Sequence, residues 1–205
     1  MDKFSFFFAF YGLILGLAVA ELLTGFARLI RAGTVRRIDT PAALMALFIF
    51  TSICATWIDA FILLDYATLD FSGLAAPVMT ATCYFLAATV MFPSGDDDLG
   101  DLGRYFAERK TVIVGLLFAA ELMVTFTLLP SFADRIEANP AVLWVYLLPY
   151  NVLIKGTFVA LLIAKGRKAI IALECALLFL FFIPYWNSGL VSRTLVREFG
   201  YLWTT

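Results

Sequence analysis

The sequence predicts an all-α integral membrane protein with six transmembrane helices and both termini on the outer side of the membrane. Two observations lead to this prediction. The 205-residue chain is 62% hydrophobic, whereas soluble domains are about 45–50% apolar. Its charged residues also lie mostly between long apolar runs, and a spanning helix needs about 20 such residues. We therefore expect this protein to act within the bilayer or at its surface.

Six apolar runs are long enough to cross the hydrocarbon core as helices. The linkers between them are too short to hold a soluble domain, so we expect residues 1–205 to form a single membrane domain. The predicted spans are Phe4–Ala27, Ala42–Leu64, Leu74–Phe92, Thr111–Leu129, Val142–Ala164 and Ala169–Trp186.

The distribution of basic residues predicts the orientation of the spans. The linkers after spans one, three and five contain Arg28, Arg31, Arg36, Arg37, Arg104, Arg109, Lys110, Lys165, Arg167 and Lys168. The opposite side contains only Lys3, Arg135, Arg193 and Arg197. Cytoplasmic loops carry the excess of Lys and Arg. This asymmetry places the odd-numbered linkers in the cytoplasm and the termini outside.

Two segments outside the spans have an amphipathic pattern and are expected to lie at the membrane interface. In residues 96–109, Leu99, Leu102 and Phe106 recur at helical spacing. The aspartates at positions 96–98 fit the N-terminus of such a helix, where carboxylates interact favourably with the helix dipole. In residues 189–205 the apolar side chains follow one face, which is typical of an interfacial helix.

A weak internal repeat relates the two halves of the chain. "AVAELLTGFARL" around Glu21 aligns with "FAAELMVTFTLL" around Glu121. Because each half would contain three spans, the halves would have inverted orientations in the membrane. Inverted repeats recur in secondary transporters, whose binding sites lie near the bilayer midplane. Chance similarity between apolar helices is the alternative explanation.

Ionisable and amide side chains inside the spans are the candidate functional residues. A charge at the bilayer centre costs at least about 2.5–3.5 kcal/mol, so such residues usually pair, bind or conduct. Glu121 and Lys155 have similar predicted depths and could form an ion pair. Asn151 and Lys155 are four residues apart and share one helix face. The candidate transport or ion site comprises Glu21, Asp59, Glu121, Asn151, Lys155 and Glu174.

Span one also contains a ridge of small residues, Gly12-x-x-x-Gly16 followed by Ala20. Small residues at this spacing let another helix backbone approach closely. The partner could be another helix of the same chain, which the sequence favours, or a second copy of the protein. A homo-oligomer therefore stays open at this stage.

These features predict a small transporter or channel that moves protons, cations or a small solute through a site near the midplane. The alternative is a non-catalytic structural or assembly subunit of a membrane complex. The chain has no histidine and no catalytic motif, so we expect neither an enzyme nor a metal site or cofactor. Its net charge of −1 gives no reason to expect a nucleic-acid partner. The expected partner is the lipid bilayer, and the expected location is a bacterial inner membrane.

Overall fold

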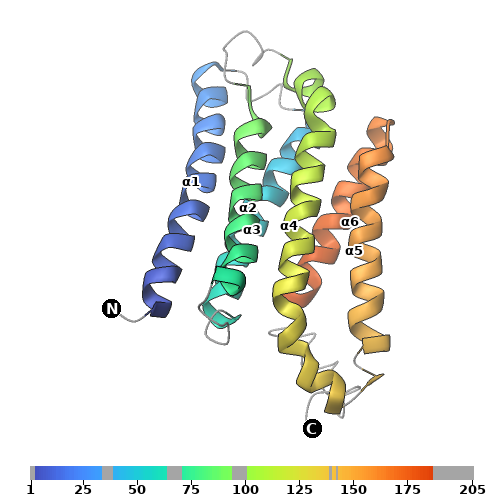
Figure 1. Cartoon of the computed structure of the whole chain (residues 1–205). Helices are drawn as coiled ribbons and strands as arrows, with labels where there is room; N and C mark the ends of the chain where they lie inside the picture. Colours follow the sequence, from blue (N-terminus) through green and yellow to red (C-terminus); the bar gives the residue numbers. More distant parts are fainter. Residues whose placement is uncertain are drawn as a thin grey trace. The chain divides into compact units, whose positions relative to one another are not determined.

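The computed structural model of the chain describes residues 3–33, 39–63, 71–93, 101–138, 140–141 and 143–186. These residues form six α-helices and contain no strand, which confirms the all-α prediction (Figure 1). Five helical stretches are long and apolar enough to cross a membrane. They correspond to the first five predicted spans. The predicted interfacial segment 189–205 and the aspartates at positions 96–98 lie outside the described residues.

The helices follow the apolar runs closely, with one clear difference in length. They are α1 (Lys3–Arg31), α2 (Thr40–Leu63), α3 (Phe71–Met91), α4 (Leu102–Ala138), α5 (Leu148–Ile163) and α6 (Arg167–Trp186). A π-helical turn, η4 (Leu143–Leu147), leads directly into α5. The fourth helix is much longer than the predicted span 111–129, because it extends beyond the span at both ends, from Leu102 to Ala138. We expected residues 102–109 to form part of a separate interfacial helix.

A carboxylate caps the N-terminus of α4, where Asp is a favoured residue. The backbone N–H of Arg104 donates a hydrogen bond of 3.0 Å to Oδ1 of Asp101. Leu102 and Phe106 are each only 2% exposed. The apolar face seen in residues 96–109 is therefore buried in protein where it falls within α4.

The chain divides into two compact units, Met1–Leu128 and Leu129–Thr205. The first unit contains α1, α2, α3 and most of α4. The boundary lies inside α4 and not between the third and fourth helices, where the two predicted repeats would meet. In the second unit, α5 packs against α6 and η4.

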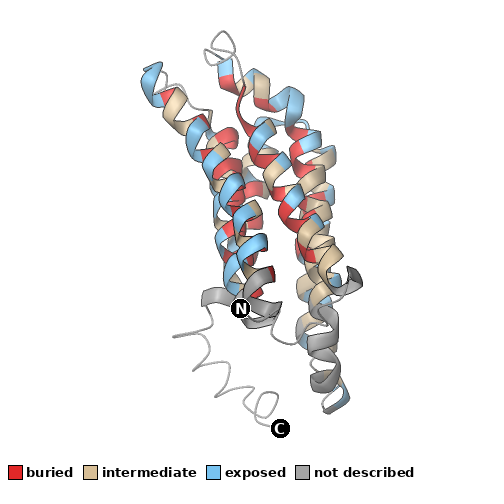
Figure 2. Ribbon diagram, turned by 60° about the vertical axis from the view of Figure 1, so that its left-hand side comes forward, coloured by how far each residue is buried: buried red, intermediate tan, exposed pale blue. Residues whose placement is uncertain are grey.

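In the first unit, α1 packs closely against α3 and also contacts α2. The buried residues of α1 recur every three or four positions, as expected for one helix face. They are Phe7, Tyr11, Leu15, Ala18, Leu22, Gly25 and Leu29. Figure 2 shows buried and exposed positions alternating along the helices. Many exposed positions are large and apolar, for example Leu13 at 61% and Phe126 at 65% exposed, which suits contact with lipid and not with water.

Four contacts place the ends of α1 and α3 beside the beginnings of α2 and α4. Nη1 of Arg28 donates a hydrogen bond of 2.8 Å to the carbonyl of Pro93. The hydroxyl of Tyr105 donates one of 3.1 Å to the carbonyl of Val90. Phe26 stacks edge-on against Phe92, with ring centroids 5.1 Å apart. At Gly103, an added Cβ would lie 3.2 Å from Cβ of Asp39.

We call this region the basic end of the first unit, because Arg28, Arg31, Arg104, Arg109 and Lys110 belong to it. The last carbonyls of a helix have no partner within the helix. At the end of α3, the side chains of Arg28 and Tyr105 supply donors to such groups. The linkers after the first and third helices therefore lie at the same end, as the alternating topology predicts.

Candidate functional site

Polar side chains gather in the interior of the first unit. Tyr11, Ser52, Thr56, Thr80 and Tyr84 are all buried. The hydroxyl of Thr56 donates a hydrogen bond of 3.3 Å to the phenolic oxygen of Tyr84, which joins α2 to α3. The hydroxyl of Thr80 instead bonds to the carbonyl of Ala76 in its own helix. Buried polar groups need such partners, because an unmade hydrogen bond in an apolar interior is costly.

Two predicted acids lie beside these tyrosines. Asp59 on α2 is within electrostatic reach of both Tyr11 and Tyr84. Glu121 on α4 is within electrostatic reach of Tyr84. Both acids are half-buried. We name Tyr11, Thr56, Asp59, Tyr84 and Glu121 the tyrosine–acid cluster. Each of the four helices of the first unit contributes at least one member.

Helix periodicity explains why these side chains meet. Tyr84 lies between Ala81 and Ala88 on the buried face of α3. Glu121 follows Leu117 by four residues, and Leu117 is buried on α4. Residues spaced by three or four positions share a helix face. The polar members of the cluster therefore lie on the same helix faces as the buried apolar residues that form the core of the unit.

A buried hydroxyl near the cluster lacks a hydrogen bond within the described part of the chain. The hydroxyl of Ser52 is fully buried and has no partner there. Ser52 precedes Thr56 by four residues and so lies on the same face of α2. Tyr11 is 2% exposed and stacks on Phe7, with ring centroids 6.0 Å apart. The hydrogen-bonding capacity that the described residues leave unused near the cluster therefore lies at Ser52.

The charges that act on the two tyrosines are acidic. Tyr84 experiences Asp59, Glu121 and the neighbouring thiol of Cys83, and Tyr11 experiences Asp59. No Lys or Arg acts on either tyrosine among the described residues. Nor do these residues contain a group of three or more His, Cys, Asp or Glu side chains that could hold a metal ion. The described residues around these two tyrosines therefore offer acids, a thiol and hydroxyls, but no metal-ligand set.

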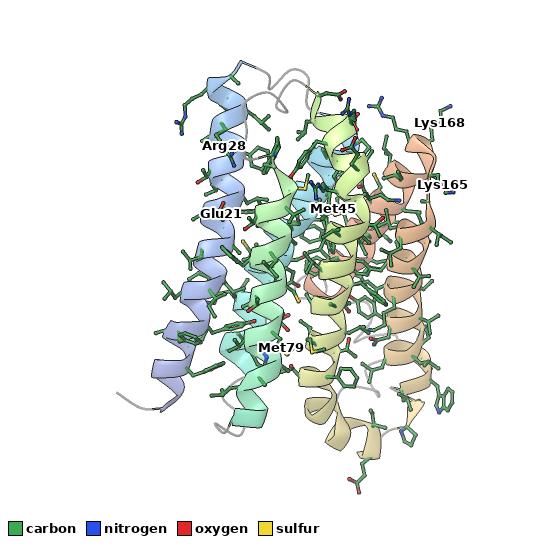
Figure 3. All side chains as sticks on the ribbon, turned by 45° about the horizontal axis from the view of Figure 1, so that its top comes forward. Glu21, Arg28, Met45, Met79, Lys165 and Lys168 are labelled. Atoms are coloured by element: carbon green, nitrogen blue, oxygen red, sulfur yellow. The ribbon has the colours of Figure 1, made fainter. Side chains whose placement is uncertain are left out.

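Glu21 lies apart from this cluster. It is ten residues after Tyr11 on α1, which corresponds to about 15 Å along the helix axis. Figure 3 shows Glu21 and Arg28 on the same half of α1, toward the basic end. Glu21 is half-buried and forms no hydrogen bond or ion pair with the residues described. Within the first unit, Asp59 and Glu121 are both within electrostatic reach of one tyrosine, Tyr84, whereas Glu21 lies nearer the helix end.

The second unit contains a separate series of hydrogen-bonded polar groups along α5. The side-chain amide of Asn151 donates a hydrogen bond of 2.8 Å to the carbonyl of Leu147, and Nζ of Lys155 donates to Oδ1 of Asn151. This pairing confirms that Asn151 and Lys155 share a face. This series of polar groups begins where η4 meets α5, next to Pro149. Because proline lacks an N–H, it suits the first turn of a helix, and the amide of Asn151 supplies a donor at this break.

Glu174 is the most deeply buried of the predicted acids, at 1% exposure on α6. It follows Lys168 by six residues, or about 9 Å along the helix. Lys165 and Lys168 lie at the turn between α5 and α6 (Figure 3). The position of Glu174 inside an apolar helix agrees with the sequence analysis, and its function stays a prediction.

The small-residue ridge of α1 is only partly covered within the chain. A Cβ at Gly12 would lie 3.7 Å from the indole of Trp57, so α2 packs there. Around Gly16 there is no heavy atom within 4 Å of such a Cβ, and Ala20 is exposed. Among the described glycines, the tightest contact is at Gly25, which the ridge does not include. A Cβ at Gly25 would lie 2.1 Å from Cδ2 of Phe92.

The sequence analysis identified the acids of the cluster but missed Tyr11 and Tyr84. Tyrosine occurs in many apolar helices, so hydropathy alone does not single it out. The sequence of α3 did contain a pattern that indicates the position of Tyr84. Tyr84 lies four residues after Thr80 and four before Ala88, and small or polar neighbours at this spacing indicate a helix face that packs against protein.

The chain matches no protein-family model, no curated protein and no solved structure. Its function is therefore argued from its own residues.

Proposed function

We propose that this protein is a small membrane transporter or channel that moves protons, cations or another small solute through a site built on the tyrosine–acid cluster. The observation that carries the proposal is the position of this cluster. Tyr84, 4% exposed, accepts a hydrogen bond from a buried threonine and lies within electrostatic reach of two acids from different helices. Acids inside a membrane bundle are expensive and usually face a pathway or a bound ion.

The proposal includes a membrane topology of six spans with both termini outside. The alternation of the first four helices supports it, because the linkers after α1 and α3 lie at one end together with their basic residues. The twenty residues of α6 would extend for about 30 Å, the thickness of the hydrocarbon core. Two inverted three-helix halves would fit this topology, and the aligned Glu21 and Glu121 support them.

Lys155 and Asn151 form a separate polar element within the second unit, which we propose as a binding group in its own right. A lysine inside a membrane helix needs a partner, and Asn151 provides one. The amide in turn bonds to the carbonyl of Leu147. This arrangement would hold the ammonium group in a fixed position on α5, where it can bind an anionic group or exchange a proton.

Flux measurements on reconstituted liposomes test the proposal. The purified protein is placed in vesicles, gradients of H⁺, Na⁺ or K⁺ are imposed, and internal ion concentration is followed. We expect flux of at least one of these cations. Asp59→Asn and Glu121→Gln should each reduce it strongly, because they remove the charge with almost no change in volume. Glu108→Gln is the matched control, since Glu108 is exposed and pairs with Arg104 at the basic end.

A second candidate function is a structural or assembly subunit of a membrane complex. One observation favours it: the open surface at Gly16 and Ala20 on α1 would accept a helix from another protein. If the folded protein shows no flux under any gradient, and if Gly16→Leu disrupts its assembly in membranes, the subunit function replaces the transport function. Flux that survives both Asp59→Asn and Glu121→Gln argues against the site proposed here.

A further inference from the structure

We infer that the turn between α5 and α6 binds the phosphate groups of anionic lipids through Lys165 and Lys168. This inference does not depend on the proposed function, because it concerns a surface of the second unit that the proposed transport site does not include. Three basic residues lie within four positions here, since Arg167 stands between the two lysines. All three side chains are exposed.

The turn is short, and main-chain hydrogen bonds fix its backbone at both ends. At the C-cap of α5, the N–H of Ala164 donates a hydrogen bond of 2.9 Å to the carbonyl of Ala160. At the start of α6, the N–H of Ile170 donates one of 3.0 Å to the carbonyl of Gly166. Because α5 and α6 also pack against each other, the turn holds its basic side chains at one end of this helix pair.

The two lysines are not paired with an acid in the described part of the chain. Lys165 and Lys168 form no ion pair or hydrogen bond there, and Figure 3 shows both side chains extending away from the helices. Residues 148–186, which cover both helices, contain a single acid, Glu174. Glu174 is 1% exposed and lies about 9 Å along the helix axis from Lys168. The charge that this turn presents at the surface is therefore positive.

The helix dipole does not explain this positive charge. The N-terminus of a helix carries a partial positive charge, so acids stabilise it and cations do not. The first turn of α6 contains no acid, and it begins instead with Arg167 and Lys168. Positive side chains at this position are repelled by the dipole and by each other, so an external anion would stabilise the turn.

The position of the turn identifies this anion as a lipid headgroup. The apolar stretch of α5 that is long enough to cross a membrane ends at Ile163, two residues before Lys165, so the lysine lies at the level of the headgroups. Val152, Val159 and Ile163 are all exposed, and their spacing places them on one face of α5. An anionic phospholipid matches both features, with its acyl chains along this face and its phosphate at the ammonium groups.

Native mass spectrometry of the full chain in detergent, titrated with phosphatidylglycerol or phosphatidylcholine, tests the inference. We expect phosphatidylglycerol to bind more tightly, because it carries a net negative charge and phosphatidylcholine does not. Lys165→Gln and Lys168→Gln should each weaken phosphatidylglycerol binding about fivefold and change phosphatidylcholine binding much less. The double change Lys165→Arg and Lys168→Arg should keep the preference. Arg104→Gln is the matched control and should leave it unchanged, because this exposed arginine already pairs with Glu108.

Three outcomes would overturn the inference. The first is a preference for phosphatidylglycerol that survives the combined change of Lys165→Gln and Lys168→Gln. The second is an equal loss in Arg104→Gln, which would show a response to net charge alone. The third is displacement of the lipid by an equal concentration of inorganic phosphate, which would assign the turn to a free anion. Thermal unfolding in detergent without lipid should be the same for the lysine variants and the unchanged protein, so that lost binding is not lost folding.

Discussion

The basic end and the tyrosine–acid cluster of the first unit both contain buried polar groups, but they satisfy them differently. At the basic end, Arg28 and Tyr105 donate to main-chain carbonyls at the end of α3. In the cluster, Thr56 bonds to Tyr84, while the hydroxyl of Ser52 has no partner in the described part of the chain. The Nε atom of Arg28 is also buried without a hydrogen bond in that part of the chain. The two regions therefore differ mainly in the acceptors they use, main-chain carbonyls at the basic end and a phenol in the cluster.

This difference helps to separate structural polar groups from functional ones. Donors that bond to helix-end carbonyls satisfy groups without a partner in the helix, and so stabilise the fold. Acids inside a membrane bundle usually face a pathway, a bound ion or a partner. We therefore expect substitutions at the basic end to change stability and leave flux per folded molecule intact. Substitutions in the cluster should do the reverse.

The largest stability effect should come from Gly25→Ala. The new Cβ would lie 2.1 Å from Cδ2 and 2.9 Å from Cβ of Phe92, so a rotation of the ring alone cannot relieve the overlap. Overpacking of this kind typically costs about 1–3 kcal/mol, and we expect about 3 kcal/mol here. Thermal unfolding in detergent measures it. Gly16→Ala is the control, because it has open space and alanine favours the helix by up to about 1 kcal/mol.

A smaller loss of stability is expected for Arg28→Gln. Its guanidinium donates to the carbonyl of Pro93 at 2.8 Å, and a hydrogen bond from a charged group contributes about 1.5–3 kcal/mol. Glutamine is too short to reach the same carbonyl, so we expect a loss of about 1.5 kcal/mol. Arg31→Gln, one turn further along on an exposed position, should change stability little. Equal effects of the two substitutions would mean that the net charge of the basic end, and not the hydrogen bond to Pro93, determines its stability.

The sequence predicted the helices well because a long apolar run in a membrane protein has few alternatives to a helix. The predicted span 42–64 corresponds to the observed helix Thr40–Leu63, and the predicted span 74–92 corresponds to Phe71–Met91. The error came at α4, where the apolar run was taken to start after Lys110. That lysine is 6% exposed, and the helix continues back to Leu102. A charged residue ends an apolar run but does not end a helix.

The site was predictable only in part, for a physical reason. Asp59 and Glu121 stand out because each is an acid in an apolar run, and a charge there is costly. Tyr84 does not stand out in this way. Its importance comes from α3 packing beside α1 and α2, which brings residues 28 positions apart, Thr56 and Tyr84, to 3.3 Å. Periodicity gives the face of each helix but not which faces meet.

Thr56→Val should separate stability from flux. Valine keeps the shape of threonine and removes only the hydroxyl that bonds to Tyr84. Hydrogen bonds between membrane helices contribute about 0.6 kcal/mol on average, so thermal unfolding should change slightly. Flux should fall, because Tyr84 loses the donor that fixes its oxygen. Thr82→Val is the control, since Thr82 is exposed and bonds to the carbonyl of Val78 within α3. Unchanged flux in Thr56→Val would show that this hydrogen bond is not part of the proposed transport site.

The smallest effect is expected for Arg104→Gln. The side chains of Arg104 and Glu108 form an ion pair of 3.1 Å, but they are 77% and 61% exposed. Exposed pairs at this helical spacing contribute about 0.3–0.5 kcal/mol and are screened by salt. Thermal unfolding at low and high salt measures this contribution, which should shrink as salt is added. A loss larger than that of Arg28→Gln would show that exposed charges stabilise the basic end more than its hydrogen bonds to carbonyls do. The basic end and the cluster would then differ in how strongly salt screens their charges, and not in whether their buried polar groups have hydrogen-bond partners.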